Sequence, residues 1–126
     1  MHIIYSKDPN FDPALLTRNS ETEQAYAAYR ARIESHGLTH EEVILAHEFK
    51  STKQVLSITW NNFRYNLAKG QVHFLLWDKE AKLSDEFIKE YIFASFEADS
   101  VIGIWVNSPE TQTVKKLKHF HFIIQE

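Results

Sequence analysis

The sequence predicts a single α+β domain with a largely antiparallel sheet. Two helical patterns occupy the first part of the chain, and four strand patterns follow, with a third helix between the second strand and the third. Strands joined by short links favour antiparallel pairing, whereas the link that carries the third helix leaves a parallel pair open. A length of 126 residues without a linker rich in proline or glycine fits one domain, residues 1–126.

The helices are predicted from their capping residues. Residues 1–12 contain a helix-breaking proline and are expected to form an extended arm. Residues 20–23, Ser-Glu-Thr-Glu, match a capping box and predict a helix that runs to His36, with Gly37 as its left-handed terminator. Residues 39–42, Thr-His-Glu-Glu, repeat the capping pattern and predict a second, shorter helix.

The strands are predicted from β-branched and aromatic residues bounded by turn residues. These segments are residues 55–60, 71–77, 101–106 and 119–124. Residues 63–69 are expected to form a wide connection between the first two strands. Ser84 can cap the third helix, whose apolar stripe is formed by Phe87, Ile88, Tyr91, Ile92 and Phe96.

Composition excludes several classes of protein. The net charge of −3 argues against a nucleic-acid partner and against binding at a membrane surface, because both need excess cations. No apolar run approaches the ~18 residues of a membrane-spanning helix, and the first residues do not resemble a signal peptide. The chain has no cysteine, which excludes disulfides and thiolate chemistry and suits a reducing compartment such as the cytoplasm.

The last predicted strand carries the sharpest candidate for chemistry. Alternate residues of a strand share a face, so His119 and His121 are expected to stand side by side, ~7 Å apart, with Phe120 and Phe122 pointing into the core. Two imidazoles held in this way can serve as a nucleophile and its partner, or as two metal ligands. The alternative is an edge strand with two solvated histidines.

His73 is a third candidate, because it shares a strand face with Leu75 and Trp77. If that face adjoins the last strand, three imidazoles converge, and a zinc site of three histidines is conceivable. The alternative is a core histidine bonded to a backbone carbonyl. The remaining histidines are interpreted as surface residues in the arm or on helices, namely His2, His36, His40 and His47.

Two polar segments could bind phosphate. Asn107, Gln112 and Thr113 offer hydroxyl and amide groups in the loop before the last strand, unless that loop is an ordinary turn. The lysines at its end raise the local potential, unless they form a solvated loop, namely Lys115, Lys116 and Lys118. In residues 61–65, the planar guanidinium of Arg64 could bind a phosphate through two parallel hydrogen bonds, and an aromatic side chain could stack on a base. The alternative is that this segment is a packed loop.

The order of these segments resembles the family of N-acetylglucosamine-induced proteins, a domain of unknown function best known from fungi. That family combines an Asn-Asp-x-Pro-Tyr segment, a His-Leu-x-x-Trp-x-Lys strand, a Gln-Ser-Val turn and a terminal His-x-His. The matching segments here are residues 61–65, 73–79, 112–114 and 119–121. The resemblance covers nearly the whole chain, although residues 61–65 lack the proline and Thr113 replaces serine.

The same segments are also similar, more distantly, to the histidine-triad superfamily of nucleotide hydrolases and transferases. That resemblance implies a HIT-like fold in which His121 is the nucleophile that attacks the α-phosphorus, with His119 as its neighbour. It also implies that Asn107, Gln112 and Thr113 hold phosphate oxygens. Ile123 departs from the pattern, because the superfamily has a third histidine at this position.

Together these observations predict a nucleotide or sugar-nucleotide phosphohydrolase or transferase that needs no cofactor and no metal. The predicted catalytic residues are His121 and His119, and the predicted substrate-binding residues are His73, Asn107, Gln112, Thr113, Arg64 and Lys118. The alternatives are a non-catalytic domain that binds a small phosphorylated ligand and a metal-binding protein built on the histidines. The histidine-triad resemblance also allows a homodimer.

Overall fold

A computed structural model describes residues 1–51, 53–108 and 117–126 of the chain. In these ranges the strands form a five-stranded sheet in the order β1-β4-β5-β3-β2, and every neighbouring pair is antiparallel. The strands are β1 (His2–Ser6), β2 (Leu56–Trp60), β3 (Gln71–Asp78), β4 (Val101–Val106) and β5 (Lys118–Gln125). The α+β class with an antiparallel sheet is therefore confirmed, and the parallel pair that the sequence left open does not occur among the described strands.

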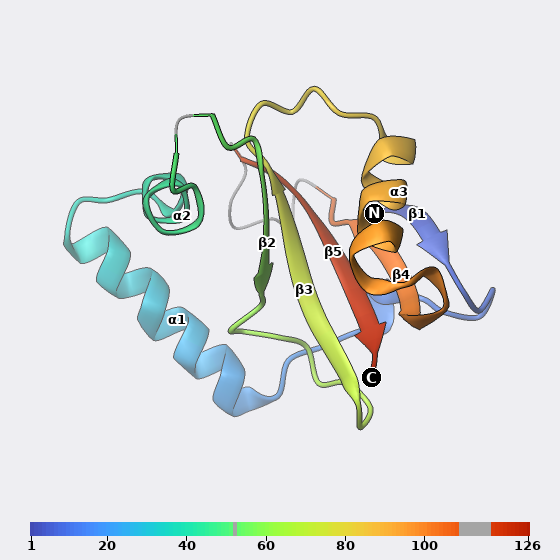
Figure 1. Ribbon diagram of the computed structural model, residues 1–126. Coiled ribbons are helices and arrows are strands. Elements are labelled where there is room, and N and C mark those ends of the chain that lie inside the picture. Colours follow the sequence, from blue (N-terminus) through green and yellow to red (C-terminus); the bar gives the residue numbers. More distant parts are fainter. Residues whose placement is uncertain (52, 109–116) are drawn as a thin grey trace.

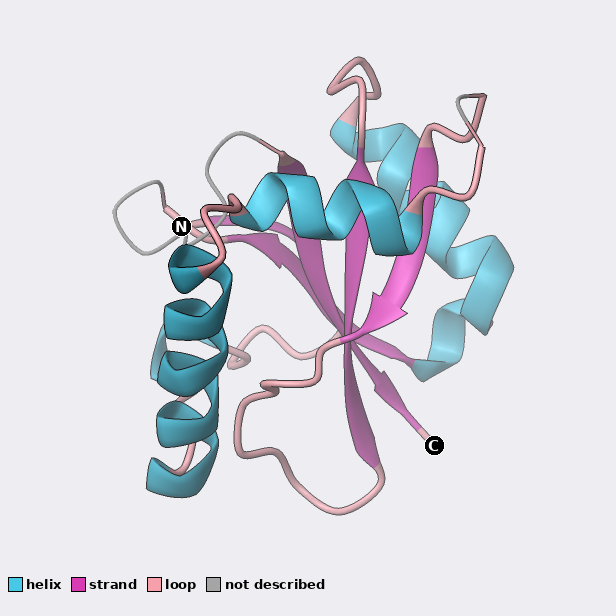
Figure 2. Ribbon diagram, turned by 90° about the vertical axis from the view of Figure 1, so that its left-hand side faces the viewer, coloured by secondary structure: helices cyan, strands magenta, loops and turns pink. Residues whose placement is uncertain are grey.

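Helices cover both faces of this sheet. They are α1 (Ser20–Ser35), α2 (His40–Glu48) and α3 (Asp85–Phe96), together with the short 3₁₀ turns Pro13–Leu15 and Ala98–Ser100. Helices α1 and α2 lie on one side of the sheet and α3 lies on the other (Figure 1). In the view from the side, α1 and α2 stand in front of the strands and α3 lies behind them (Figure 2).

The ends of the helices follow their capping residues, with one correction. Helix α1 is capped by Asn19 rather than Ser20, because the Asn19 carboxamide accepts a hydrogen bond from the Thr22 amide at 2.8 Å. At the other end, Gly37 has a φ of +71° and ends the helix as expected. The capping box of α2 and the Ser84 cap of α3 are both present.

The main core lies between the sheet and α3. Phe120 and Phe122 of β5 are fully buried there, in one cluster with Ile88 and Ile92 of α3. The predicted stripe on α3 is too wide, because Phe87 is 48% exposed and stacks on the half-exposed Tyr91 rather than on the core. The helix therefore contacts the sheet through a narrower face than its sequence pattern predicts.

The amino-terminal arm is part of the sheet rather than free. Residues 2–6 pair with β4 as the edge strand β1, so the arm expected to be merely extended is ordered by a ladder of backbone hydrogen bonds. After this strand the chain crosses to the other face, where the Phe11 ring packs on the Trp105 ring at 5.8 Å between centroids. Gly103 permits this approach, because a Cβ at that position would lie 2.5 Å from the Phe11 ring.

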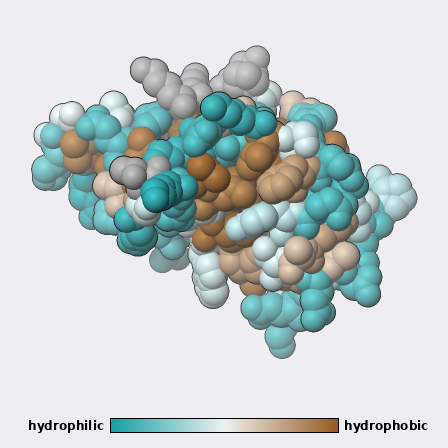
Figure 3. All heavy atoms as spheres, turned by 45° about the horizontal axis from the view of Figure 1, so that its top comes forward, coloured by the Kyte–Doolittle hydropathy of each residue, from teal (hydrophilic) through white to brown (hydrophobic). Residues whose placement is uncertain are grey.

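One surface of the molecule gathers hydrophobic residues in the middle of the face, with hydrophilic residues around them (Figure 3). A small second core of Phe49, Trp77 and Leu117 is buried apart from the main one, against side chains of α2. No helix within the described ranges is both long enough and apolar enough to cross a membrane.

Candidate functional site

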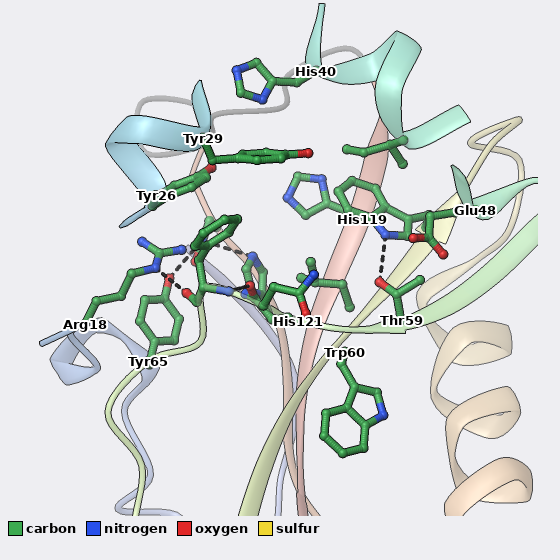
Figure 4. Close-up of a pocket in the computed structure, with 17 residues that line it drawn as sticks. Arg18, Tyr26, Tyr29, His40, Glu48, Thr59, Trp60, Tyr65, His119 and His121 are labelled. Atoms are coloured by element: carbon green, nitrogen blue, oxygen red, sulfur yellow. Dashed lines mark hydrogen bonds between the residues drawn. The ribbon is translucent and has the colours of Figure 1, made fainter. Parts of the chain in front are cut away.

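A cavity of about 300 Å³ lies between the two amino-terminal helices and the sheet (Figure 4). Its wall combines aromatic rings, amides, imidazoles and two oppositely charged side chains. The lining residues are Arg18, Tyr26, Tyr29, His40, Ile44, Glu48, Thr59, Trp60, Asn61, Asn62, Phe63, Tyr65, Leu75, Trp77, Asn107, His119 and His121.

The strand register brings three histidines together beside this cavity. His119 and His121 line it, whereas His73, which was predicted to bind substrate, does not line it and instead contacts His121. β5 is the central strand, and His119 and His121 lie on its face opposite to Phe120. His73 lies on the neighbouring strand β3, and its Nε2 is 2.9 Å from Nδ1 of His121. The side chains of these histidines are buried, with only 1–8% of their surface exposed. The alternative of an edge strand with solvated histidines is therefore wrong.

The hydrogen bonds of Asn107 determine which nitrogen of His121 carries the proton. The Trp105 indole, which can only donate, gives its hydrogen bond to the Asn107 carboxamide oxygen at 3.1 Å. The Asn107 amide nitrogen therefore faces His121 and lies 3.2 Å from its Nε2. Because an amide N–H donates, Nε2 of neutral His121 is the unprotonated nitrogen, and the proton resides on Nδ1.

This arrangement in turn assigns the proton of His73. Nδ1–H of His121 donates to Nε2 of His73, so neutral His73 carries its own proton on Nδ1. In this tautomer Nδ1–H of His73 faces the Asn61 amide nitrogen at 3.4 Å, an unfavourable contact because both groups donate. The opposite tautomers would make this contact a hydrogen bond but would place two donors at the shorter contact between Asn107 and His121, at 3.2 Å, so we assign the protons from the shorter contact. A 180° flip of the Asn61 carboxamide would break a hydrogen bond, because its oxygen accepts from the Phe63 N–H at 2.9 Å.

His119 is held separately. Its Nδ1 lies 3.0 Å from the Leu117 carbonyl oxygen, which can only accept, so Nδ1 carries the proton and Nε2 is unprotonated. The His119 ring packs against the Trp77 indole with 4.7 Å between centroids. The Trp77 indole N–H donates a 3.2 Å hydrogen bond to the hydroxyl of Thr59, a residue of β2. The cavity floor therefore presents two imidazoles with an unprotonated Nε2.

Burial keeps these imidazoles neutral. Desolvation, with a smaller contribution from the Arg18 charge, lowers the pKa of His73 from 6.5 to about 3. Desolvation also holds the pKa of His121 well below its ordinary value, assisted by His73, His119 and Arg18. The pKa of His119 is lowered by burial as well, against a smaller opposing effect of the bond to Leu117. At neutral pH the site therefore offers lone pairs rather than positive imidazolium charges.

An aromatic stack connects these histidines to Arg18. The Tyr65 ring lies nearly parallel to His73, at 5.0 Å between centroids and 13° between planes, and its hydroxyl is 3.4 Å from the Asn107 amide nitrogen. The Arg18 guanidinium lies over the Tyr65 ring at 5.0 Å and over the Tyr26 ring at 4.7 Å. On the other side of the histidines, Trp105 stacks on His121 at 5.3 Å.

Several predicted ligand-binding residues lie elsewhere. Arg64 is exposed and does not line the cavity. Lys118 extends over the Phe120 ring at 5.2 Å, on the α3 side of the sheet, because even-numbered residues of β5 face away from the histidines. Gln112 and Thr113 lie outside the described residues, as do Lys115 and Lys116.

Other cavity residues were not singled out from the sequence as site residues. His40, interpreted as a surface residue, is half-buried and lines the cavity, and its ring lies 6.3 Å from that of Tyr29. Arg18 and Glu48 supply opposite charges to the wall. Each comes from a different element, and no local spacing relates them to the histidines, so the sequence carried no signal for their meeting.

The three histidines do not form a metal centre. Within residues 1–51, 53–108 and 117–126, no group of three or more His, Asp or Glu side chains is placed so that it could hold a metal ion. The direct contact between His73 and His121 explains this, because these two nitrogens face each other rather than a common centre. The geometry therefore speaks against the zinc alternative.

Comparison with known proteins supports the fold alone. The chain matches no protein-family model and no curated protein. A solved structure, the crystal structure of HTC1, is similar to it with a TM-score of 0.63 and 21% sequence identity, over 90% of this chain and 77% of that one. A likeness at this identity means that the two chains share an α+β architecture, and the chemistry of the site has to be argued from its own residues.

Proposed function

We propose that the cavity binds a nucleotide or sugar nucleotide and that His121 attacks the α-phosphorus of this ligand. The observation that carries the proposal is the unprotonated Nε2 of His121, which lies at the cavity wall beside an amide donor. A neutral imidazole is a competent nucleophile at neutral pH, and its lowered pKa keeps Nε2 unprotonated. The hydrogen bond from the Asn107 amide to this nitrogen has to break when the ligand binds, which frees the lone pair for the attack. The Asn107 amide beside it is suited to donate to a phosphate oxygen.

The first step forms a bond between Nε2 of His121 and phosphorus, while the bond from phosphorus to the leaving group breaks. The leaving group departs with the electron pair, and His121 acquires a positive charge. Nδ1–H of His121 then donates to Nε2 of His73, and this bond strengthens as the charge develops. His73 thereby keeps His121 in the tautomer that the attack needs.

The second step transfers the nucleotidyl group to water or to another acceptor hydroxyl. The acceptor oxygen bonds to phosphorus, the bond to His121 breaks and its electron pair returns to Nε2. The acceptor also loses a proton, and we assign this proton to Nε2 of His119, which lines the cavity and is unprotonated because Nδ1 of the same ring donates to a carbonyl. With water as acceptor the product is a nucleoside monophosphate.

The size and lining of the cavity support a single nucleotide unit. A volume of about 300 Å³ is at the lower end of small-molecule sites. Tyr26 and Tyr29 contact the Phe63 ring at 4.8 and 5.1 Å, and they form an aromatic wall of the kind on which a base can stack. Glu48 and Thr59, across the cavity, are suited to accept hydrogen bonds from sugar hydroxyls.

The proposal is tested by assaying cleavage of nucleoside phosphoramidates, nucleoside diphosphates and nucleotide sugars. Chromatography of the products and intact-mass detection of a nucleotidyl adduct on the protein provide two readouts. His121→Ala should abolish product and adduct, and it should retain the fold by circular dichroism. The matched control is His47→Ala, because His47 is an exposed histidine of α2 that does not line the cavity. Turnover that survives in His121→Ala would refute the proposal.

A second candidate is a non-catalytic domain that binds the same ligands. The observation that favours it is Ile123, which is 1% exposed on the histidine face of β5, opposite His73 and Gly103. An apolar side chain there supplies no proton donor for a leaving group. On this hypothesis a nucleotide raises the melting temperature of the protein but yields no product and no adduct after prolonged incubation.

A further inference from the structure

The histidines do not supply the positive charge that a phosphate group needs. All three are held neutral by burial, and Lys118, the described lysine nearest to His119 in sequence, does not line the cavity. Of the lysines and arginines that the structure describes, Arg18 is the one that lines this cavity. Any positive charge that the described lysines and arginines supply to the cavity wall therefore comes from the Arg18 guanidinium.

The surroundings of Arg18 orient its guanidinium firmly but leave donors unused. Nε donates to the Phe63 carbonyl, and the plane is held over the rings of Tyr26 and Tyr65. Nη1 makes only a long contact of 3.4 Å with Glu23, and Nη2 has no hydrogen bond to a described residue. The side chain is 17% exposed, so it is largely removed from water, where a charge-assisted hydrogen bond to an anion is strong.

We propose that Arg18 binds the phosphate group of the ligand through these remaining donors, and that it is the residue that makes the cavity selective for anions. This inference rests on the proposed function and deepens it. Arg18 precedes α1 directly, so the anion site is built from the amino-terminal part of the chain, whereas the proposed nucleophile comes from the last strand. The ligand would then bridge two parts of the fold that are far apart in sequence.

The charge of Arg18 also acts on the histidines themselves. It lowers the pKa of both His73 and His121, in addition to the effect of burial. The same cation that attracts an anion therefore disfavours protonation of the proposed nucleophile. Tyr65 separates the two functions in space, since its ring contacts the guanidinium and stacks on His73.

The alternative is that Arg18 only fastens the segment that contains Phe63 to α1. The two roles make different predictions for anion binding, and inorganic pyrophosphate is the probe that tests them. Its binding is measured by calorimetry and by the shift in melting temperature, each at increasing NaCl concentration. Wild-type protein should bind the probe, and binding should weaken as salt rises. Arg18→Gln should bind about tenfold to hundredfold more weakly, with a smaller dependence on salt.

The matched control is Arg64→Gln, which removes the same charge from an exposed position outside the cavity and should bind pyrophosphate as the wild type does. Equal affinity of Arg18→Gln and wild type overturns the inference, and so does a wild type that fails to bind pyrophosphate. If Arg18→Gln does not fold, Arg18→Lys decides: it keeps the charge but loses the planar fork, and unchanged affinity would count against Arg18.

These results are independent of the nucleotide cleavage assay. Pyrophosphate binding that depends on Arg18, without cleavage of any nucleotide, would support the anion site and refute the catalytic proposal. Cleavage that depends on His121 and is unaffected by Arg18→Gln would support the catalytic proposal and refute the anion site at Arg18.

Discussion

Acidification from pH 7 to pH 5 should destabilise the fold through its buried histidines. The folded state holds His73 neutral with a pKa of about 3, whereas in the unfolded chain it titrates near 6.5. Below pH 6.5 the unfolded state therefore binds more protons than the folded state, and the free energy of unfolding falls as the pH falls. His73 alone should remove about 1.4 kcal/mol per pH unit, or about 2 kcal/mol by pH 5, and His119 and His121 act in the same direction.

The assay is urea unfolding at several pH values between 7 and 5, a window that avoids most carboxylate titration. Replacement of the titrating group by His73→Gln should reduce the slope of unfolding free energy against pH, whereas the exposed His47→Gln should leave the slope as it is. An NMR titration of the wild type gives a second readout, in which the His73 ring signals should not move above pH 5. A slope unchanged in His73→Gln, or a His73 that titrates near 6.5, would refute the reasoning.

Three further predictions concern the scaffold and are measured by urea unfolding at pH 7. Gly103→Ala should cost about 1–3 kcal/mol, because the new Cβ would meet the Phe11 ring at 2.5 Å; no loss would mean that this ring is not packed there. Ile88→Ala should lower the free energy of unfolding by about 2–5 kcal/mol, because the Ile88 side chain is fully buried. The control is Phe87→Ala at the half-exposed neighbouring position, which should lower it by about 0.5 kcal/mol or less. Thr39→Ala should cost about 1 kcal/mol through loss of the capping box of α2, and equal stability would show that the cap contributes nothing.

The fold could be predicted from the sequence wherever a local pattern determines a local structure. Gly37 ends α1, the capping box starts α2 and Ser84 caps α3, because each of these interactions joins residues at most a few positions apart. The amino-terminal arm shows the limit of this reasoning. Its residues 2–6 include three strand-forming residues in a row, Ile-Ile-Tyr, but the partner that orders them is β4, about a hundred residues later, and no local pattern identifies that partner.

The candidate site was predicted in part for the same reason. Strand alternation places His119 and His121 on one face of β5, and it places His73 on the matching face of β3. The same alternation should have excluded Lys118, whose parity puts it on the α3 side. Arg18 and His40 could not be found in this way, because they reach the cavity from separate segments that only the packed structure brings over the sheet.

The class of the fold, most of the helix caps and the placing of two imidazoles on one face of a strand can be predicted from local patterns, since these features depend on periodicity and capping over short distances. The packed fold, by contrast, makes β5 the central strand, places His121 beside Asn107 and against His73, and brings Arg18 to the wall of the same cavity. Each of these features depends on contacts between segments that are far apart in the sequence. They follow from which surfaces bury the most apolar area together and leave the fewest polar groups unpaired, a property of the whole chain rather than of any segment.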